Sequence, residues 1–575
     1  MRKLLPALLL LAGCLRSSPA KFAEAPEARP LSALSAAPRR APKTREVDFE
    51  RLKSARSEPA NWLTYYGAYD GQRYSALSEI NRANVKRLRP AWTFQFGQIG
   101  LSATPATYAF EAAPIVVDGV MYVSGWDGYV WALDAATGRE LWRYKQEIPV
   151  DTPLCCGNVN RGVAVAKGKV FVATPNGFLL ALDAETGQRV WGKAFADVRA
   201  GESATMAPLV VKDLVIVGSS GAEYGARGHI DAFKLETGER VWRLYPVPKP
   251  GEPGSETWPK DSDAWARGGG TAWVTGTYDP DLDLLYWGTS NPSPDFDGSV
   301  REGANLYTDS VLALDPDDGS IRWHYQWTPH DVWDYSGVNE NILFDHKGRK
   351  LLAHFDRNGY LFILDRRDGK LLHAVPFGRA TWGEIDRSGK VTVLKTPTKD
   401  GAEICPGPAG SKEWTHAAYS PRTGLLYAPI IDACAVYKLK PVEFREGLPY
   451  WGGEAEVPAD GSTAGYVKAF DPESGKEVWA WKNEKPMVSS VLATAGDLVF
   501  AGEPTGEFNA FDARTGELLW QFQTGSGLHG NAVTYSVNGK QYVAVPAGWG
   551  GWVKGFAPDM LGAPRGSALI SFALP

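Results

Sequence analysis

Short apolar stretches alternate with polar turns along most of the chain, a pattern typical of β-strands. In "GVMYVSGWDGYVWALD" and "GKVFVATPNGFLLALD", which end at Asp134 and Asp183, two such stretches flank a Gly-containing turn. An Asp-initiated turn, a Gly able to adopt positive φ and a further strand follow each of them. One unit is therefore expected to be a four-stranded antiparallel meander.

The last part of this unit recurs along the sequence, as in "ALDAATGRELW", "ALDAETGQRVW" and "AFDARTGELLW". Six copies end in tryptophan, at Trp142, Trp191, Trp242, Trp323, Trp479 and Trp520, and a seventh, "ILDRRDGKLLH", ends in His373. A recurrence of roughly 50 residues in an all-β chain indicates a β-propeller, in which each repeat is one blade.

The spacing of the repeats predicts eight blades. The step from Trp242 to Trp323 is longer than one unit and is expected to hold an insertion. The step from His373 to Trp479 is about two units and includes "AAYSPRTGLLYAPI", interpreted as a degenerate blade. The segment near residues 62–96 is expected to close the ring against the C-terminal strands. Residues 56–575 are thus predicted to form one eight-bladed domain.

The N-terminal segment indicates export. Residues 1–13, "MRKLLPALLLLAG", have a charged start and a short apolar core, and "LAGC" resembles a lipobox that would make Cys14 the acylated first residue. Ordinary cleavage near Ala20 is the alternative. Residues 14–55 are rich in Ala, Pro, Ser and Arg and are expected to be a flexible tether. A periplasmic, lipid-anchored protein follows, with no other membrane contact.

Composition changes this picture in two respects. The net charge of −5 over 575 residues gives no indication of nucleic-acid binding. Once Cys14 is lipidated, Cys155, Cys156, Cys405 and Cys434 remain, an even number suited to an oxidising compartment. Pairing 155 with 156 and 405 with 434 is favoured, although two other connectivities stay open. No C-x-x-C-H haem motif is present.

The Trp-ended repeats resemble the blades of quinoprotein dehydrogenases, which use pyrroloquinoline quinone (PQQ). The resemblance runs from "NWLTYYGAYDGQRYSALSEINRANV" to "GELLWQFQTGSG". It implies an enzyme that oxidises a small alcohol to an aldehyde or ketone with PQQ and calcium and passes electrons to a separate c-type cytochrome. The sequence does not indicate which alcohol. Lipid-anchored propeller scaffolds for outer-membrane protein assembly share such repeats without chemistry, and a binding-only sensor is a third possibility.

Two motifs match the faces of the cofactor site. "CCGNVNRG" resembles the family's vicinal disulfide, Cys155–Cys156, which packs against the planar cofactor, with Arg161 pairing with a cofactor carboxylate. The plainer reading is two buried thiols and a loop arginine. "RGGGTAW" resembles the stretch that places Trp273 on the other face, with Thr271 donating a hydrogen bond. Further cofactor contacts implied by the resemblance are Glu111, Thr205, Ser220, Gly221, Ala222, Arg357 and Trp414.

The resemblance also implies a cation site made of Glu223, Asn291 and Asp334, with Asp334 serving in addition as the general base. In lanthanide-dependent relatives a second aspartate stands two positions after that base. Ser336 occupies this position here, which leaves two carboxylates and favours calcium. Glu413 and Thr415 flank Trp414 where many relatives have an asparagine, so one cofactor contact lacks its usual residue.

Overall fold

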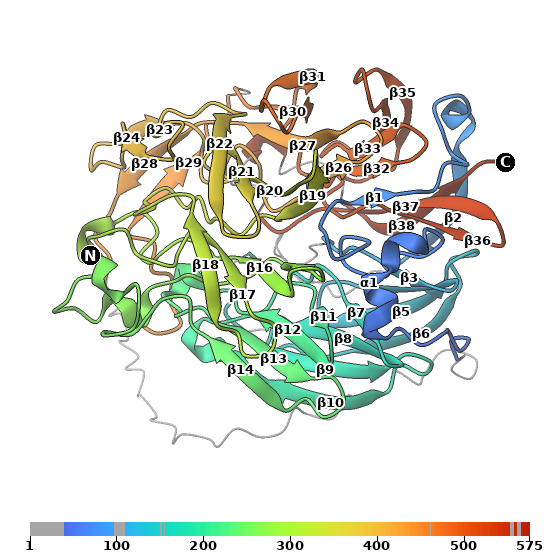
Figure 1. Cartoon of the computed structure of the whole chain (residues 1–575), viewed down its shortest axis with the longest axis horizontal. Coiled ribbons are helices and arrows are strands. Elements are labelled where there is room, and N and C mark those ends of the chain that lie inside the picture. Colours follow the sequence, from blue (N-terminus) through green and yellow to red (C-terminus); the bar gives the residue numbers. More distant parts are fainter. Residues whose placement is uncertain are drawn as a thin grey trace, which may run out of the picture.

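The computed structural model describes residues 40–96, 110–149, 152–154, 156–460, 462–552, 557–560 and 565–575. In these ranges most strands belong to eight sheets of four or five strands, which are arranged around a common centre (Figure 1). Neighbouring strands within each four-stranded sheet run antiparallel. The sequence-based prediction of an all-β, eight-bladed propeller is therefore confirmed.

Five blades are built from four consecutive strands each. They are β3 (Ile115–Val117), β4 (Val120–Ser124), β5 (Tyr129–Asp134) and β6 (Glu140–Lys145); β7 (Ala164–Ala166), β8 (Lys169–Thr174), β9 (Phe178–Asp183) and β10 (Arg189–Ala194); β11 (Leu209–Val211), β12 (Leu214–Gly218), β13 (Ile230–Lys234) and β14 (Arg240–Leu244); β15 (Thr277–Asp279), β16 (Leu284–Gly288), β17 (Ser310–Leu314) and β18 (Ile321–Gln326); and β19 (Ile342–His346), β20 (Arg349–Phe355), β21 (Tyr360–Asp365) and β22 (Lys370–Pro376).

The remaining three blades are less regular. They are β26 (Ala418–Ser420), β27 (Leu425–Asp432), β30 (Ala464–Phe470) and β31 (Glu477–Asn483); β32 (Leu492–Thr494), β33 (Leu498–Gly502), β34 (Glu507–Asp512) and β35 (Leu518–Gln523), with the short β1 (Tyr74–Ser75) added to it; and β36 (Val533–Val537), β37 (Lys540–Gly548), β38 (Ser567–Ala573) and β2 (Arg89–Gln95).

The eighth blade closes the ring by joining both ends of the folded chain. Strand β2 pairs antiparallel with β38, with Thr93 opposite Ile570. Both lie beside the C terminus in Figure 1. The expectation that the segment near residues 62–96 meets the C-terminal strands is confirmed, because this blade takes one strand from that segment and three from the end of the chain.

One part of the predicted blade assignment is wrong. The segment "AAYSPRTGLLYAPI" and Trp479 lie in the same sheet, β26–β27–β30–β31, and do not form two blades. The extra length comes from an insertion whose strands pair with one another, in a two-stranded sheet of β23 (Gly383–Ile385) and β24 (Val391–Val393) and a three-stranded sheet of β25 (Ala402–Ile404), β28 (Ala435–Leu439) and β29 (Gly453–Glu456). The total of eight stands because the C-terminal strands supply the missing blade.

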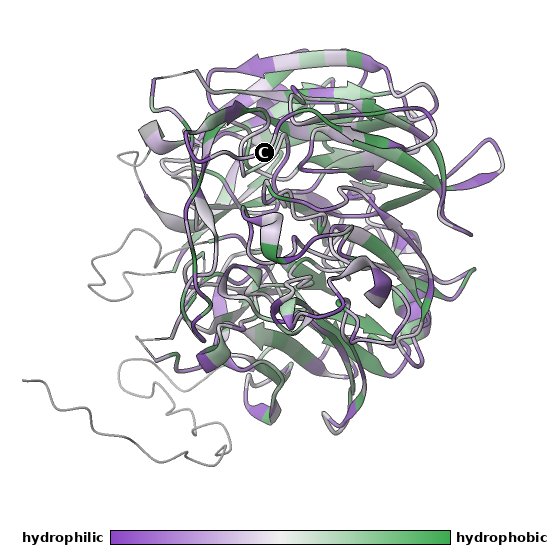
Figure 2. Cartoon of the chain, turned by 90° about the vertical axis from the view of Figure 1, so that its left-hand side faces the viewer, coloured by the Kyte–Doolittle hydropathy of each residue, from purple (hydrophilic) through white to green (hydrophobic). Residues whose placement is uncertain are grey.

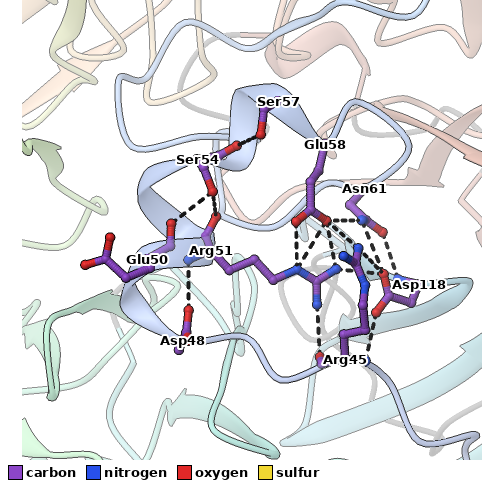
Figure 3. A network of polar contacts seen from close by, with 9 residues as sticks. All are labelled: Arg45, Asp48, Glu50, Arg51, Ser54, Ser57, Glu58, Asn61 and Asp118. Carbon is purple, nitrogen blue, oxygen red and sulfur yellow. Dashed lines mark hydrogen bonds and ion pairs between the residues drawn. The ribbon is translucent and has the colours of Figure 1, made fainter.

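The expected tether also ends earlier than predicted. Residues 40–55 belong to the folded body, where helix α1 (Phe49–Lys53) begins at Asp48, whose side chain accepts a hydrogen bond from the Arg51 backbone N–H. The buried Arg51 guanidinium forms ion pairs with Glu58 at 2.9 Å and Asp118 at 2.6 Å (Figure 3). The boundary at residue 55 is thus wrong. Cys14 lies outside the described residues, as does the whole predicted signal.

Six tryptophans, five of them from the repeats, connect a blade to the next. The Trp142 indole N–H donates to the Ala184 carbonyl at 3.0 Å, and a Cβ placed on Gly187, whose φ is +71°, would lie 2.6 Å from the Trp142 ring. Only glycine tolerates both the backbone conformation and the ring contact. The same pairing occurs at Trp92–Gly138, Trp191–Gly238, Trp242–Gly319, Trp323–Gly369 and Trp479–Gly516.

Hydrophobic residues are common along the strands (Figure 2). The first strands of the blades, such as β3, β7 and β11, are wholly buried, whereas β10 is partly exposed. The first strands therefore face the middle of the ring. Cys405 and Cys434 form a disulfide, which confirms that predicted pairing. Within the described ranges, no helix has the length and apolarity to cross a membrane.

We expect Gly516→Ala to destabilise the protein more than Gly168→Ala. Both glycines have positive φ, +74° and +68°, so both variants incur the left-handed backbone cost of about 1–2 kcal/mol. Only the alanine at position 516 would meet the Trp479 ring, at 2.5 Å, whereas nothing lies within 4 Å at Gly168. The added crowding should cost about 1–3 kcal/mol more.

Thermal unfolding midpoints of the two variants, measured at one scan rate, test this expectation. Equal midpoints would show that the tryptophan–glycine contact does not contribute to stability.

Candidate active site

A cavity of about 290 Å³ lies where the segments leading into the first strands converge. Glu111 precedes β3, Arg161 precedes β7, Thr205 precedes β11, Trp273 precedes β15 and Asp334 precedes β19, and all five line the cavity. Equivalent positions of successive blades thus contribute one side chain each. This arrangement brings residues more than 200 positions apart in the sequence into one site.

Backbone hydrogen bonds between neighbouring blades hold these segments in place. The Ala113 N–H donates to the Arg161 carbonyl at 2.9 Å, and the Arg161 N–H donates to the Thr205 carbonyl at 3.0 Å. Further round the ring, the Ala272 N–H donates to the Ser219 carbonyl at 2.8 Å. Because backbone groups carry these links, the cavity wall is fixed independently of the side chains that line it.

The structure brings together most of the site residues predicted from the sequence. Lining the cavity are Glu111, Cys156, Arg161, Thr205, Ser220, Glu223, Trp273, Asp334, Arg357 and Trp414. Four other predicted residues, Gly221, Ala222, Thr271 and Asn291, are not among the described residues that line it. The Thr271 hydroxyl lies 2.8 Å from that of Ser290. Cys155 lies outside the described residues, so its pairing with Cys156 stays a prediction.

The glycine run before Trp273 permits a close backbone contact. A Cβ on Gly269, whose φ is +70°, would lie 2.4 Å from the Asn291 carbonyl oxygen. The neighbouring Gly270 N–H donates to that same carbonyl at 3.0 Å. The segment that carries Trp273 is therefore packed directly on the segment that carries Asn291.

Arg161 is a buried cation between two tryptophans. Its guanidinium carbon lies 4.4 Å from the ring centroid of Trp414 and 4.9 Å from that of Trp273, and its Nη2 lies 3.0 Å from Glu111 Oε2. Burial raises the pKa of Glu111, and Arg161 opposes that rise. Arg161 Nε and Nη1 are buried without a hydrogen-bond partner among the described residues. These donors fit a carboxylate of an anionic ligand such as PQQ.

Arg357 lies between two carboxylates in the turn that joins β20 to β21. Its Nη2 is 3.3 Å from Glu413 Oε1 and its Nη1 is 4.0 Å from Asp334 Oδ1. Burial alone would lower the pKa of Arg357, but Glu413 and Asp334 more than offset burial and raise it. Burial also raises the pKa of Asp334, against the effect of Arg357. Arg357 therefore stays charged beside a carboxyl group poised to bind a proton.

Oxygen donors lie in the cavity and next to it. Glu223 lies in a 3₁₀ turn (Ala222–Tyr224) after β12, and Asn291 follows β16. The Asn291 side-chain amide donates to Asp295 Oδ1 at 3.1 Å, and Asp295 lines the cavity with Glu223 and Asp334. This donor chemistry fits a hard cation. No three acidic, histidine or cysteine side chains of the described chain converge closely enough to hold a metal alone, so other oxygens must complete the shell.

Sequence reasoning missed several cavity residues. Asp295 stands four positions after Asn291, and Glu413 stands where many members of the family have a different residue. His529 and Trp552 come from the C-terminal blade. Burial lowers the pKa of His529 to about 3, so its imidazole is neutral. The sequence signal that could have identified Asp295 is its position in the same short segment as the predicted ligand Asn291.

The insertion between β28 and β29 forms part of the cavity rim. The Tyr450 N–H donates to the Glu223 carbonyl at 2.7 Å, and the Phe296 N–H donates to the Trp451 carbonyl at 2.8 Å. Trp451, which is 45% exposed, and Phe296 both line the cavity. With Trp552, they give the rim an aromatic character.

The chain resembles quinoprotein dehydrogenases over most of its length. Residues 62–377 and 482–543 match the family model "PQQ: Glucose/ethanol/alcohol dehydrogenase, beta-propeller domain". The chain is 38% identical over 565 residues to quinoprotein alcohol dehydrogenase PedH of Pseudomonas putida, covering 92% of this chain and 93% of that protein. It is 39% identical over 541 residues to a lanthanide-dependent methanol dehydrogenase of Methylacidiphilum fumariolicum, covering 88% and 87%.

A solved europium-containing methanol dehydrogenase superposes with a TM-score of 0.85 at 37% identity, covering 91% of this chain and all of that one. Fold and cavity together define a propeller of the quinoprotein class. The chain belongs to the PQQ-dependent alcohol dehydrogenase family.

We expect Arg161→Lys to weaken PQQ binding by about 10- to 100-fold, because hydrogen bonds to charged groups contribute about 1.5–3 kcal/mol and lysine lacks the planar fork. Arg227→Lys is the matched control, since Arg227 also stacks on aromatic rings, at 4.3 Å from Tyr245 and 5.0 Å from Trp265, but does not line the cavity. Fluorescence titration of metal-loaded apoprotein with PQQ measures both affinities. Equal PQQ affinities in the two variants would show that Arg161 does not bind the cofactor.

Proposed function

We propose that the protein oxidises alcohols to aldehydes or ketones with PQQ and a bound cation, and delivers the electrons to a separate c-type cytochrome. Family membership supports the alcohol dehydrogenase activity. The single observation that carries the proposal is the cavity itself, where two buried arginines, Arg161 and Arg357, meet two tryptophans and the carboxyl group of Asp334. We further propose that the Cys155–Cys156 pair and Trp273 cover the two faces of the cofactor.

PQQ, when bound, would supply a quinone carbonyl that accepts a hydride, and with it two electrons, from the alcohol carbon. Asp334 would take the hydroxyl proton at a carboxylate oxygen. Burial raises the pKa of this group while Arg357 lowers it, so the carboxylate is a stronger base than an exposed aspartate yet retains a cation beside it. Arg357 would also stabilise negative charge that develops next to Asp334.

The ligand chemistry of the site supports the binding of a hard cation. Glu223, Asn291 and Asp334 would hold it through oxygen atoms, the donors that calcium and other hard cations prefer. The sequence favours calcium because Ser336 leaves two carboxylates in the predicted ligand set.

The aromatic rim supports an alcohol with an apolar substituent as substrate. Phe296, Trp451 and Trp552 offer stacking and apolar contact at the cavity mouth, while the reacting hydroxyl would point to Asp334. The scaffold alternative is not favoured, because a scaffold has no use for this cavity and the curated relatives are dehydrogenases. We also retain the periplasmic location and the lipid anchor at Cys14 as proposals.

The acceptor is open to direct measurement. We expect holoenzyme with an alcohol substrate to reduce a c-type cytochrome faster than it consumes oxygen. The two electrons must leave the site one at a time, and the sequence contains no haem motif that could accept them. Cytochrome absorbance and an oxygen electrode follow the two reactions in parallel. Efficient turnover with oxygen alone would overturn the acceptor proposal.

We expect Asp334→Asn to lower kcat by about 10²- to 10⁴-fold, the range that general bases contribute. Asparagine keeps the shape of the side chain and removes its basicity. Asp318→Asn, on an exposed turn between β17 and β18, is the control. Dye-linked alcohol oxidation by protein reconstituted with PQQ and calcium measures the effect. A kcat equal to that of the wild-type protein would exclude Asp334 as the base.

A further inference from the structure

Glu413 is a mostly buried carboxylate in the wall of the cavity. Its Oε1 lies 3.3 Å from Arg357 Nη2, and its Oε2 accepts a hydrogen bond from the Trp414 backbone N–H. Only 12% of the Glu413 side chain and 4% of the Arg357 side chain are exposed. Solvent therefore screens this ion pair much less than a pair on the surface.

Contacts with the backbone hold Arg357 in place independently of the Glu413 carboxylate. The Arg357 carbonyl accepts a hydrogen bond from the Ser411 N–H at 2.9 Å, and Arg357 Nη2 donates to the Pro408 carbonyl. A Cβ placed on Gly410 would lie 2.4 Å from the Cβ of Arg357, so this segment packs directly against the arginine. The charge of Glu413 is therefore not needed to keep the guanidinium in the cavity wall.

The Arg357 guanidinium retains one donor for a ligand. Its Nε is buried without a hydrogen-bond partner among the described residues, and Arg357 lines the cavity. An anion that binds this donor would be attracted by Arg357 and repelled by Glu413. The neighbouring cation, Lys412, forms its ion pair with Glu340 at 2.8 Å and donates to the Glu413 backbone carbonyl at 3.2 Å. The negative charge of Glu413 is therefore balanced by Arg357.

We propose that Glu413 offsets part of the positive charge that Arg357 presents to the cofactor, and so limits the affinity of the site for PQQ and lowers the midpoint potential of the bound quinone. The proposal rests on the proposed function, because it takes PQQ, an anion with several carboxylates, as the ligand. Reduction adds electrons to the ligand, so a less positive site disfavours the reduced form. A lower potential eases the transfer of electrons to an acceptor. Glu413 would act through Arg357 and not on the reacting atoms.

Glu413→Gln tests the proposal, because it removes the charge and keeps an oxygen that can accept from Arg357. We expect this variant to bind PQQ about tenfold more tightly than the wild-type protein, since a unit negative charge is removed from a buried pair. Fluorescence titration of calcium-loaded apoprotein measures the affinity. Glu443→Gln is the matched control: Glu443 lies 3.4 Å from Arg445, but 82% of its side chain is exposed, so the affinity for PQQ should stay within about twofold of the wild-type value. Unchanged or weaker binding by Glu413→Gln would overturn the proposal, because the loss of a merely structural contact does not tighten binding.

Further variants separate the charge of Glu413 from its shape. Glu413→Asn should also bind PQQ more tightly than the wild-type protein, whereas Glu413→Asp, which keeps the charge, should not. A redox titration followed by absorbance should give bound PQQ a higher midpoint potential in Glu413→Gln than in the wild-type protein. An equal or lower potential would contradict the proposal.

A double-mutant cycle tests the ion pair in protein without PQQ, so its result does not depend on the proposed function. Arg357→Met leaves the Glu413 carboxylate buried without its partner. We therefore expect Arg357→Met to lower the thermal unfolding midpoint of the apoprotein more in the wild-type background than in the Glu413→Gln background. Equal effects in both backgrounds would overturn the proposal. Coupling in the cycle without PQQ binding by any variant would refute the proposed function and leave the charge compensation of Arg357 standing.

Discussion

The contact between a repeat tryptophan and a glycine of the next blade is the interaction on which the ring depends. Each blade alone is a small sheet with two apolar faces that need cover. The indole covers part of one face, and in five of the six contacts, Trp323 excepted, its N–H donates to a carbonyl of the neighbouring blade, as Trp142 does to Ala184. The glycine must lack a side chain so that the ring can approach. These paired constraints fix the angle between blades and thereby the position of every segment that reaches the middle.

The regular part of the fold could be read from the sequence because its signals are local. A turn aspartate, a positive-φ glycine and an outer-strand tryptophan lie within eleven residues of one another in most repeats, with Lys234 replacing the aspartate in one copy and His373 the tryptophan in another. The irregular part could not, because pairing partners there are distant. Inserted strands such as β28 and β29 have the same alternation as blade strands, and only their pairing in a separate sheet, where β28 lies between β25 and β29, excludes them from the blade of β26, β27, β30 and β31. Residues 40–55 likewise have a loop-like composition, yet Arg51 is buried through contacts with Glu58 and Asp118.

The site residues also divide into those that local sequence motifs predict and those that depend on distant partners. Motifs such as "RGGGTAW" and "NRG" identified residues that do meet in one cavity, because they occupy equivalent positions before the first strands. The cavity carboxylates Asp295 and Glu413 are not themselves part of these motifs, although each stands close to a predicted site residue in the sequence. The groups that contact these carboxylates are known only after folding. Glu413 pairs with Arg357, which lies more than fifty residues away in the sequence, and Asp295 accepts a hydrogen bond from Asn291 in a loop. Electrostatic balance is a property of the assembled ring.

The closure of the ring by β2 and β38 sets the order in which the protein can mature. Strand β2, which contains Thr93, has no partner on this edge until β38, which contains Ile570, has been synthesised and folded. Six blades use only strands close in sequence and can form progressively along the chain, whereas the blade of β32–β35 also binds β1 and the last blade joins segments that are the farthest apart. The segment that carries Glu111 also contacts the last blade, because the Asn531 N–H donates to the Ala112 carbonyl. The cavity is therefore complete only after these last strands have been synthesised and folded.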